Sequence, residues 1–419
     1  MPQPVNTGEI PLEMYERILP EEIAKLRQLA GDLKGARVLH INSTPYGGGV
    51  SELLRSQVPF ERALGIDANW QVISGEPSFF RVTKAFHNAL QGGAHSLTRA
   101  DQEIYLAYSS LNAKDLKGDY DFIIVHDPQP AAIRSLRPDI NAHWIWRCHV
   151  DTSNPNPEVW DFLVDYVNAY DAAVFTLREF KPYGIKIRVE TITPAIDPLS
   201  PKNMELPDEM ISHLVNWTGV SDDSPLICQV SRFDVWKDPL GVIEAYRLVK
   251  QEIPNVNLAL VGSMALDDPE GWDMYEKLLE ASRKDEQIHI YTNVGDLQVN
   301  AFQRLSDVVI QKSIREGFGL VVSETLWKGT PVVAGKAGGI PIQMAGGGGF
   351  LVESIEETAK RVLELLSNPV MAAEEGKRGK EHVRKNFLIT RLIKDELMLL
   401  ESLVYKFSSI SVEDSGKSA

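Results

Sequence analysis

Short apolar runs alternate with longer amphipathic stretches along most of the chain, and this alternation predicts strands and helices in turn. The strands expected in the first half are 38–42, 70–74, 122–126, 144–148, 172–176 and 191–194. Those expected in the second half are 226–230, 257–261, 288–291, 308–311, 331–334 and 350–352. Because strands that alternate with helices form parallel sheets, each half is predicted to be an α/β domain of Rossmann-like architecture.

The stretch 197–207 separates the two halves and is the expected linker. It contains three prolines, which disfavour both helices and strand pairing. We therefore expect an N-terminal domain over 1–200 and a C-terminal domain over 201–388. Helical apolar spacing returns over 389–407, while 408–419 is a small, polar tail that is expected to fray.

Composition indicates a globular protein and argues against several classes of binding partner. With 419 residues, 43% of them hydrophobic, the chain can fill two cores. A net charge of -15 argues against nonspecific binding to nucleic acids and against docking on an anionic membrane. The two cysteines lie in apolar runs, which argues against a disulfide framework, and neither a signal peptide nor a membrane-spanning run is evident. We expect a cytoplasmic protein with a small-molecule partner.

The most informative segment runs from Glu316 to Glu324, with the sequence EGFGLVVSE. It joins the predicted strand 308–311 to a helical pattern, and the amides at the start of a helix attract anions. Gly317 and Gly319 let a ligand approach the backbone, while the two carboxylates can accept hydrogen bonds from hydroxyl groups. The segment therefore predicts a site for a sugar joined to a phosphate, although an ordinary turn with two solvated glutamates has the same pattern.

Two cations follow the first predicted strand of the second half. Arg232 and Lys237 come directly after 226–230, at the edge of a parallel sheet where ligands bind. A guanidinium and an ammonium group placed there would stabilise a departing diphosphate. Taken alone, the same two residues would also fit a solvated loop.

Candidate residues in the first half also follow predicted strands. Gly48 and Gly49 lie between the strand 38–42 and a helical pattern, without the spacing of a Walker or dinucleotide loop. They predict either a close-approach loop or a tight turn. His149 follows 144–148 at the ligand-facing edge of the sheet, whereas His126 and Asp127, at the end of 122–126, are weaker candidates for an acceptor pocket.

The order of Arg-x4-Lys and Glu-x7-Glu resembles the GT-4 family of retaining glycosyltransferases. Four further segments, 40–50, 82–92, 125–130 and 146–151, are similar to the trehalose glycosyltransferring synthases of that family. The resemblance implies a GT-B fold, with two Rossmann-like domains whose parallel sheets face each other across a deep cleft. It also implies that helix 389–407 crosses back to the N-terminal domain.

The resemblance further implies reversible transfer of glucose from a nucleoside-diphosphate glucose to glucose, which gives trehalose with retained configuration. Arg232 and Lys237 would assist departure of the diphosphate, Glu316 would hold donor sugar hydroxyls, and Glu324 would bind the nucleotide ribose. His149 would lie near the donor sugar. Backbone contacts to sugar and phosphate oxygens would come from Gly48, Gly49, Gly317, Phe318, Gly319 and Leu320.

Several features leave alternatives open. The adjacent pair Asp267 and Asp268 fits a turn or helix cap better than a metal site. The resemblance to GT-B enzymes implies that no cofactor is obligatory and that Mg²⁺ would act at most as a phosphate counterion. The glycines Gly346–Gly349 are expected to form a floppy loop that could alter donor binding. A trehalose phosphorylase and a non-catalytic sugar-nucleotide-binding protein are the rival hypotheses. The nucleotide, the acceptor, the direction of the reaction and the oligomeric state, a homodimer included, are not fixed.

Overall fold

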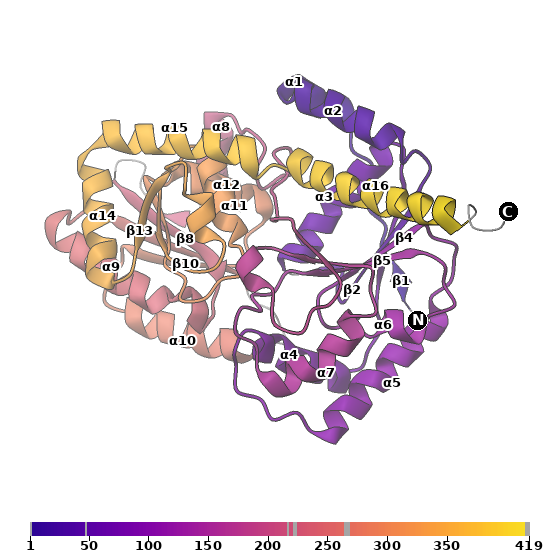
Figure 1. Cartoon of the computed structure of the whole chain (residues 1–419). Helices are drawn as coiled ribbons and strands as arrows, with labels where there is room; N and C mark the ends of the chain where they lie inside the picture. The colour runs from indigo at the N-terminus through magenta and orange to yellow at the C-terminus, as the bar shows by residue number, and fades with distance from the viewer. Residues whose placement is uncertain (1, 47, 216–217, 221–223, 264–268, 415–419) are drawn as a thin grey trace. The chain divides into compact units, whose positions relative to one another are not determined.

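The computed structural model describes residues 2–46, 48–215, 218–220, 224–263 and 269–414. The chain divides into two compact units (Figure 1). Unit 1 comprises Met1–Pro194 and Ile389–Ala419, and unit 2 comprises Ala195–Leu388. The boundary therefore falls between Pro194 and Ala195, just before the predicted linker. Gly47 and the pair Asp267 and Asp268 lie outside the described residues.

Unit 1 is built on a seven-stranded sheet with the order β1-β3-β2-β4-β5-β6-β7, parallel except for β1. The strands are β1 (Gln3–Pro4), β2 (Arg37–Asn42), β3 (Asp67–Val72), β4 (Phe122–His126), β5 (His143–Cys148), β6 (Ala172–Phe175) and β7 (Arg188–Thr191). Each predicted strand of this half is present, although β7 shares a single residue with the predicted 191–194. The two-residue β1 has no apolar run and was not predicted.

The helices of unit 1 surround this sheet. They are α1 (Leu12–Ile18), α2 (Pro20–Gly31), α3 (Gly49–Ala63), α4 (Pro77–Leu90), α5 (Arg99–Asp115), α6 (Ile133–Leu136), α7 (Pro157–Val167) and α16 (Ile389–Asp414). Helix α16 packs against α2 and α3. Helix α16 continues to Asp414 and so includes part of the segment 408–419 that the sequence predicts as a polar tail.

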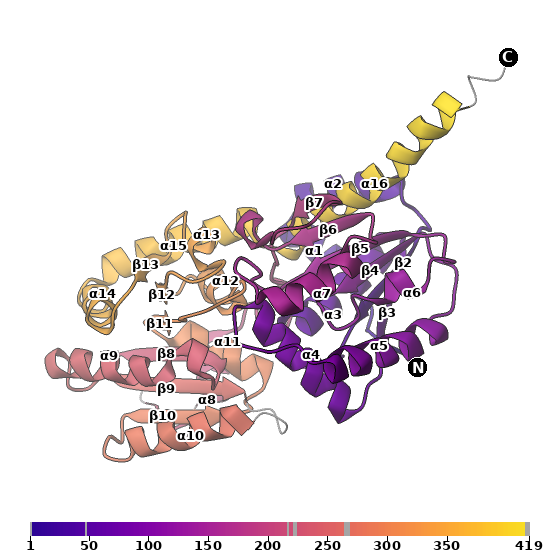
Figure 2. The ribbon, with the colours of Figure 1, turned by 60° about the horizontal axis from the view of Figure 1, so that its bottom comes forward.

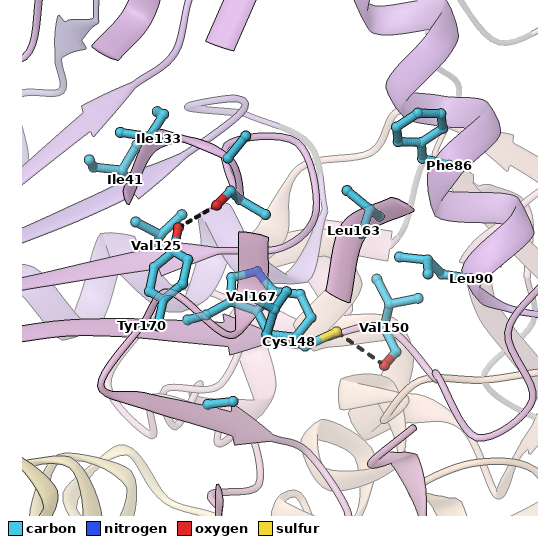
Figure 3. Close-up of a cluster of buried hydrophobic side chains, with 14 of the residues drawn as sticks. Ile41, Phe86, Leu90, Val125, Ile133, Cys148, Val150, Leu163, Val167 and Tyr170 are labelled. Carbon is cyan, nitrogen blue, oxygen red and sulfur yellow. Dashed lines mark hydrogen bonds between the residues drawn. The ribbon is translucent and has the colours of Figure 1, made fainter. Parts of the chain in front are cut away.

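The core of unit 1 on the side of α4 to α7 joins strand and helix side chains (Figure 3). Ile41 and Val125 from the strands lie in one buried cluster with Phe86 from α4 and Leu163 from α7. The hydroxyl of Tyr170 donates a hydrogen bond to the carbonyl of Ala131 at 2.8 Å, which satisfies a polar group inside this apolar cluster. The face of the sheet toward α4 to α7 is thereby covered by packed helices.

Unit 2 has a six-stranded parallel sheet with the order β10-β9-β8-β11-β12-β13. The strands are β8 (Leu226–Arg232), β9 (Asn257–Ser263), β10 (Ile288–Thr292), β11 (Val308–Gln311), β12 (Val332–Gly335) and β13 (Gly349–Val352). Figure 2 shows these strands one above another in this order. The strand order reverses between β8 and β11, and ligands of such sheets bind at the carboxyl ends of the two strands at this switch point.

The helices of unit 2 begin with α8 before the first strand, then connect successive strands and continue beyond the last one. They are α8 (Asp208–Val215), α9 (Pro239–Glu252), α10 (Pro269–Ser282), α11 (Asp296–Leu305), α12 (Leu320–Trp327), α13 (Ile340–Gln343), α14 (Ile355–Ser367) and α15 (Pro369–Asn386). A parallel bridge between Ile196 and Leu388 joins the first and last segments of the unit. No helix in the described part of either unit is long and apolar enough to cross a membrane.

The glycine run Gly346–Gly349 is tightly packed, so the prediction of a floppy loop was wrong. Gly347, Gly348 and Gly349 adopt φ values of 107°, 109° and 125°. The amides of Gly348 and Gly349 donate to one carboxylate oxygen of Glu375, at 2.9 and 3.1 Å. The glycines are needed because the backbone takes left-handed conformations against α15, and not because the segment must move.

We expect Gly349→Ala to lower the free energy of unfolding of the protein by at least about 2 kcal/mol, through backbone strain and overpacking. A Cβ atom at this position would lie 2.0 Å from the carbonyl oxygen of Val332. The matched control is Gly31→Ala, where a Cβ meets nothing within 4 Å. Denaturant unfolding should show a loss for the first variant and none for the second; equal stabilities would contradict the packing described here.

Candidate active site

The two motifs of the second half meet at the switch point of unit 2. Strands β8 and β11 are parallel neighbours, and the loops that follow them carry Lys237 and Glu316. The ammonium nitrogen of Lys237 lies 2.5 Å from Oε2 of Glu316, and the hydroxyl of Ser313 lies 3.3 Å from the same oxygen. Both charged side chains are mostly buried, with exposed fractions of 16% and 11%. A cation and a carboxylate are thus held together at the edge where ligands of this sheet type bind.

Local hydrogen bonds fix the turn that presents Lys237. The side chain of Asp234 accepts from the amides of Trp236 and Lys237, at 2.9 and 3.1 Å, and so caps the short 3₁₀ turn Val235–Lys237. The side-chain amide of Gln229, inside β8, donates to the carbonyl of Lys237 at 2.8 Å. The amide of Ile314 donates to the carbonyl of Trp236 at 2.8 Å, which ties the two loops together. The position of Lys237 is therefore determined by backbone geometry.

The loop that carries Glu316 is held from the neighbouring loop after β12. Gly319 caps α12 with φ 81°, and the amide of Gly339 donates to the carbonyl of Gly317 at 2.9 Å. A Cβ atom at Gly338 would lie 1.8 Å from the carbonyl oxygen of Glu316, so this close approach requires glycine. The side chain of Gln343 donates to the carbonyl of Phe318 and accepts from the amide of Ser323. The start of α12, with Leu320 as its first residue, is fixed beside Glu316.

Arg232 and Glu324 do not join this pair directly. The side chain of Arg232 is 64% exposed, and its guanidinium lies 3.3 Å from the carboxylate of Asp234. The side chain of Glu324 is 4% exposed, with Gln303 at 3.5 Å and Lys202 at 3.9 Å from its two oxygens. The structure therefore brings one cation and one carboxylate of the predicted set together. Of the other two residues, Arg232 is exposed and Glu324 is buried.

A half-buried lysine, Lys328, contacts the backbone of Glu324 from the end of the same helix. The ammonium group of Lys328 donates to the carbonyl of Glu324 at 2.9 Å and to the side chain of Asn203 at 3.1 Å. Burial lowers the pKa of Lys328 to about 7, and the carboxylate of Glu324 opposes that shift. Lys202 and Lys328 were not predicted from the sequence, because neither directly follows a predicted strand.

In unit 1, Gly48 and Gly49 lie at the start of α3, after β2. Gly48 caps the helix with φ 105°, and a Cβ atom there would meet nothing within 4 Å. The glycine is thus required by its backbone conformation. The carbonyl of Thr44 accepts hydrogen bonds from the side chains of Asn42 and Ser51, both at 2.8 Å, which fixes the turn before the helix.

His149 follows β5 and contacts the residues at the end of β4. Its amide donates to the carboxylate of Asp127 at 2.8 Å, and its ring Nε2 lies 3.0 Å from Nδ1 of His126. His126 is fully buried, and its other ring nitrogen lies 3.1 Å from Nδ1 of His40. Both ring nitrogens of His126 are thus engaged by neighbouring imidazoles, and its contact with an acceptor stays a prediction.

Asp127 differs from an ordinary surface carboxylate. It adopts φ 65°, and burial raises its pKa to about 7, although the amide of His149 opposes that shift. The carbonyl of Asp127 accepts from the indole of Trp146 at 3.0 Å. The residue therefore orients His149 and the turn after β4, and it remains a candidate contact for an acceptor.

Several polar residues behind this edge were not identified from the sequence. His40, Glu61, Arg147 and Glu396 are buried in unit 1, with relative exposures of 0%, 2%, 2% and 3%. The available signal was a polar residue inside an apolar run, such as His40 within β2 and Glu61 after Val58-Pro59-Phe60. Buried polar groups of this kind need hydrogen-bond partners, and these four residues contact one another or His126.

Comparisons with known proteins show which family the chain is similar to. Residues 40–182 match the family model described as the N-terminal domain of trehalose synthase, and residues 216–382 match the model of group 1 glycosyl transferases. A trehalose synthase of Rubrobacter xylanophilus is 52% identical and covers 96% of this chain and 100% of its own length. A trehalose synthase of Pyrococcus horikoshii is 46% identical, with coverages of 95% and 98%.

More distant similarities concern other activities. A trehalose phosphorylase of Pleurotus pulmonarius is 28% identical over 76% of this chain and 50% of its own length. The crystal structure of an α,α-trehalose 6-phosphate synthase from Burkholderia multivorans superimposes with a TM-score of 0.70 at 16% identity, covering 89% of this chain and 99% of that one. This structural similarity confirms the predicted GT-B fold. The two trehalose synthases, similar along almost their whole length, show that the chain belongs to the trehalose synthase family of glycosyltransferases.

Proposed function

We propose that the protein transfers a glucosyl group from a nucleoside-diphosphate glucose to glucose, forming trehalose reversibly with retention of configuration. The observation that carries the proposal is the ion pair between Lys237 and Glu316 at the switch point of unit 2. A phosphate-bearing sugar offers a matching partner to each group, since phosphate oxygens bind the ammonium group and sugar hydroxyls donate to the carboxylate. The names of the relatives supply the identity of the sugar.

Binding of the donor would exchange one set of partners for another. Without a ligand, the charges of Lys237 and Glu316 neutralise each other, and their attraction offsets part of the cost of removing both from water. In the complex, Lys237 would turn to the diphosphate and Glu316 to the sugar hydroxyls. The exposed guanidinium of Arg232 has room to add a second positive charge, and the amides from Gly317 to Leu320 provide neutral donors.

In the reaction, the bond between the anomeric carbon and the diphosphate oxygen breaks as the bond to the acceptor oxygen forms on the same face. The acceptor proton passes to the departing phosphate oxygen, so no separate base is needed. Lys237 and Arg232 would stabilise the charge that grows on the diphosphate, which is the task that a metal ion performs in other transferases. We therefore propose that no metal is obligatory.

The remaining predicted residues receive the following roles in this proposal. Nδ1 of His149 contacts a sugar hydroxyl, and the backbone at Gly48 and Gly49 approaches phosphate oxygens. Glu324 binds the ribose through Oε1. Lys202 lies 3.9 Å from that oxygen, beyond hydrogen-bonding distance, so Oε1 can accept a hydrogen bond from a ribose hydroxyl. Asp127 is the candidate contact for the acceptor.

A donor and acceptor screen tests the proposal. We expect trehalose to form from glucose and one of ADP-, UDP- or GDP-glucose, and the anomeric configuration of both sugars can be read by NMR. Treatment with EDTA should leave most of the activity, since Lys237 and Arg232 supply the positive charge. Breakdown of trehalose should require a nucleoside diphosphate. Breakdown that runs with inorganic phosphate instead would identify a phosphorylase, and binding of nucleotide-sugar without turnover would identify a non-catalytic protein.

A further inference from the structure

A line of hydrogen-bonded side chains runs through unit 1 from Glu61 to His149. Oε2 of Glu61 lies 3.1 Å from Nε2 of His40, and Nδ1 of His40 lies 3.1 Å from Nε2 of His126. Nδ1 of His126 then lies 3.0 Å from Nε2 of His149. The three imidazoles come from β2, the end of β4 and the turn after β5, which are neighbours in the sheet. The line therefore connects a buried carboxyl group to the ligand-facing edge.

The outer end of the line is accessible. Nδ1 of His149 has no hydrogen-bond partner among the described residues, and it is not among the buried unpaired atoms. This nitrogen is the one that the proposed function assigns to a sugar hydroxyl. Whether it carries a proton decides whether it donates or accepts a hydrogen bond.

The inner end is a pair of carboxyl groups with one compensating cation. Glu396 accepts from the guanidinium of Arg147 at 3.0 Å, while Glu61 is not in contact with that cation in the described structure. The side-chain amide of Gln57 donates to both carboxyl groups, at 2.9 and 2.7 Å. Other charged groups around the cluster are Arg62, Asp127, Arg391 and Asp395.

One proton on this carboxyl pair makes the immediate cluster electrically neutral. Arg147 balances Glu396, so a charged Glu61 would leave an uncompensated buried anion. Burial raises the pKa of Glu61 and that of Glu396 to about 7, and the hydrogen bond between the two carboxyl groups lowers the pKa of Glu61 and raises that of Glu396. We place the shared proton on Glu61 because the guanidinium of Arg147 contacts Glu396. Burial also lowers the pKa of His40 to about 4 and those of His126 and His149 well below their ordinary values, so the three imidazoles are neutral.

Each neutral imidazole carries a single N–H, and each of the three hydrogen bonds in the line needs a single proton. Whether Glu61 donates to His40 or accepts from it therefore determines which nitrogen donates in each of the other two hydrogen bonds. We propose that Glu61, His40 and His126 are positioning residues that set the tautomer of His149, and that one proton on Glu61 decides whether Nδ1 of His149 donates or accepts a hydrogen bond.

The two states follow from counting protons. When Glu61 is protonated, it donates to His40, which donates to His126, which donates to Nε2 of His149, and the proton of His149 must sit on Nδ1. When Glu61 is charged, every bond reverses, His149 donates from Nε2, and Nδ1 is a bare acceptor. When Glu61 loses its proton, that proton passes to Nε2 of His40, and His40 and His126 each pass the proton on Nδ1 to Nε2 of the next imidazole. His149 releases its Nδ1 proton to solvent, so the number of protons on each imidazole is unchanged.

The same geometry could suggest a metal site, because ligand atoms of His40, Glu61 and Glu396 lie within 4.8 Å of one another. Arg147 argues against it. Its guanidinium already contacts Glu396, so a divalent cation would lie close to a buried positive charge.

The test is an NMR titration of the full-length protein with ¹⁵N-labelled histidine, in which one-bond couplings show which ring nitrogen carries the proton. His149→Asn assigns the signals of His149 among the nine histidines. Below the pKa of Glu61 we expect the proton on Nδ1 of His149, and above it on Nε2. In Glu61→Gln, the side-chain amide of Gln57 would donate to the new carbonyl oxygen as it does to Oε1 of Glu61, which turns the new NH₂ group toward His40. That group can only donate, so the proton of His149 should stay on Nδ1 throughout.

His289 in unit 2 serves as the internal control, because its Nε2 lies 3.2 Å from Asn257 and outside the line. Its signals should be the same in the wild type and in Glu61→Gln. A wild-type His149 that keeps one tautomer across the titration, or that takes up a second proton as imidazolium, would overturn the proposal.

Two further readouts separate this inference from the proposed function, on which its catalytic consequence rests. Because folded Glu61 keeps its proton to a higher pH than the unfolded chain, its contribution to stability is full at low pH and is lost as the pH rises through about 7. Glu61→Gln should remove that part of the pH dependence of unfolding. If the tautomer switch is observed but no glucosyl transfer is found, the relay stands and the proposed function fails.

Discussion

Replacement of Lys237 by alanine is expected to lower kcat/KM for glucosyl transfer by about 10²- to 10³-fold, the loss typical of one preorganised group that stabilises transition-state charge. The ammonium group of Lys237 is the mostly buried cation of the switch-point loop, paired with Glu316 at 2.5 Å. Its removal takes away the positive charge and also leaves the carboxylate of Glu316 unpaired, facing the diphosphate. Both effects disfavour the donor and the departing group. Steady-state kinetics on the purified, folded variant measures the loss.

The matched control is Lys250→Ala. Lys250 also forms an ion pair at 2.5 Å, with Asp285, but this pair joins the end of α9 to the loop before β10, at the opposite edge of the sheet. We expect this variant to retain normal transfer and to lose at most a little stability. Near-normal turnover in Lys237→Ala, or an equal loss in Lys250→Ala, would contradict the assignment of Lys237.

Replacement of Glu316 by glutamine should give a different kinetic pattern. The carboxylate is the proposed acceptor for donor sugar hydroxyls, and loss of one charge-assisted hydrogen bond, about 1.5–3 kcal/mol, corresponds to roughly 10- to 100-fold in kcat/KM. Lys237 would at the same time lose its resident counterion. We therefore expect the variant to transfer poorly while it binds a nucleoside diphosphate as well as the wild type does, or better.

The control for this variant is Glu353→Gln. Glu353 pairs with Lys336 at 2.7 Å in the same unit, but both side chains are largely exposed. The pair is therefore expected to contribute little to stability and nothing to transfer. If Glu316→Gln lost nucleoside-diphosphate binding together with activity, the separate roles of Lys237 and Glu316 would have to be abandoned.

Much of this site could be predicted because the relevant residues follow strands. Alternation of apolar runs located β8 and β11 correctly, and the ends of parallel strands share one edge of a sheet. From this the sequence could place Lys237 and Glu316 near a ligand. Their ion pair could not be predicted, since it depends on the strand order and on the hydrogen bond that joins the loops at Ile314 and Trp236.

Other features required the packed structure. The glycines at 346–349 suggest mobility when only the sequence is considered, and only their contacts with Glu375 and Val332 show that they fill a space without room for side chains. The hydrogen-bonded line of histidines could not be predicted either, because it depends on which strands are neighbours in the folded sheet. His40 and His126 are separated by 86 residues, and each one alone is an ordinary buried histidine.

The most direct test of the central claim is calorimetric titration of a nucleoside diphosphate into the wild type, Lys237→Ala and Glu316→Gln. If a diphosphate binds at the switch point beside Lys237, affinity should fall at least about tenfold in Lys237→Ala, which corresponds to about 1.4 kcal/mol, and should not fall in Glu316→Gln. Equal affinity of all three proteins for every nucleoside diphosphate tested would show that the diphosphate binds elsewhere.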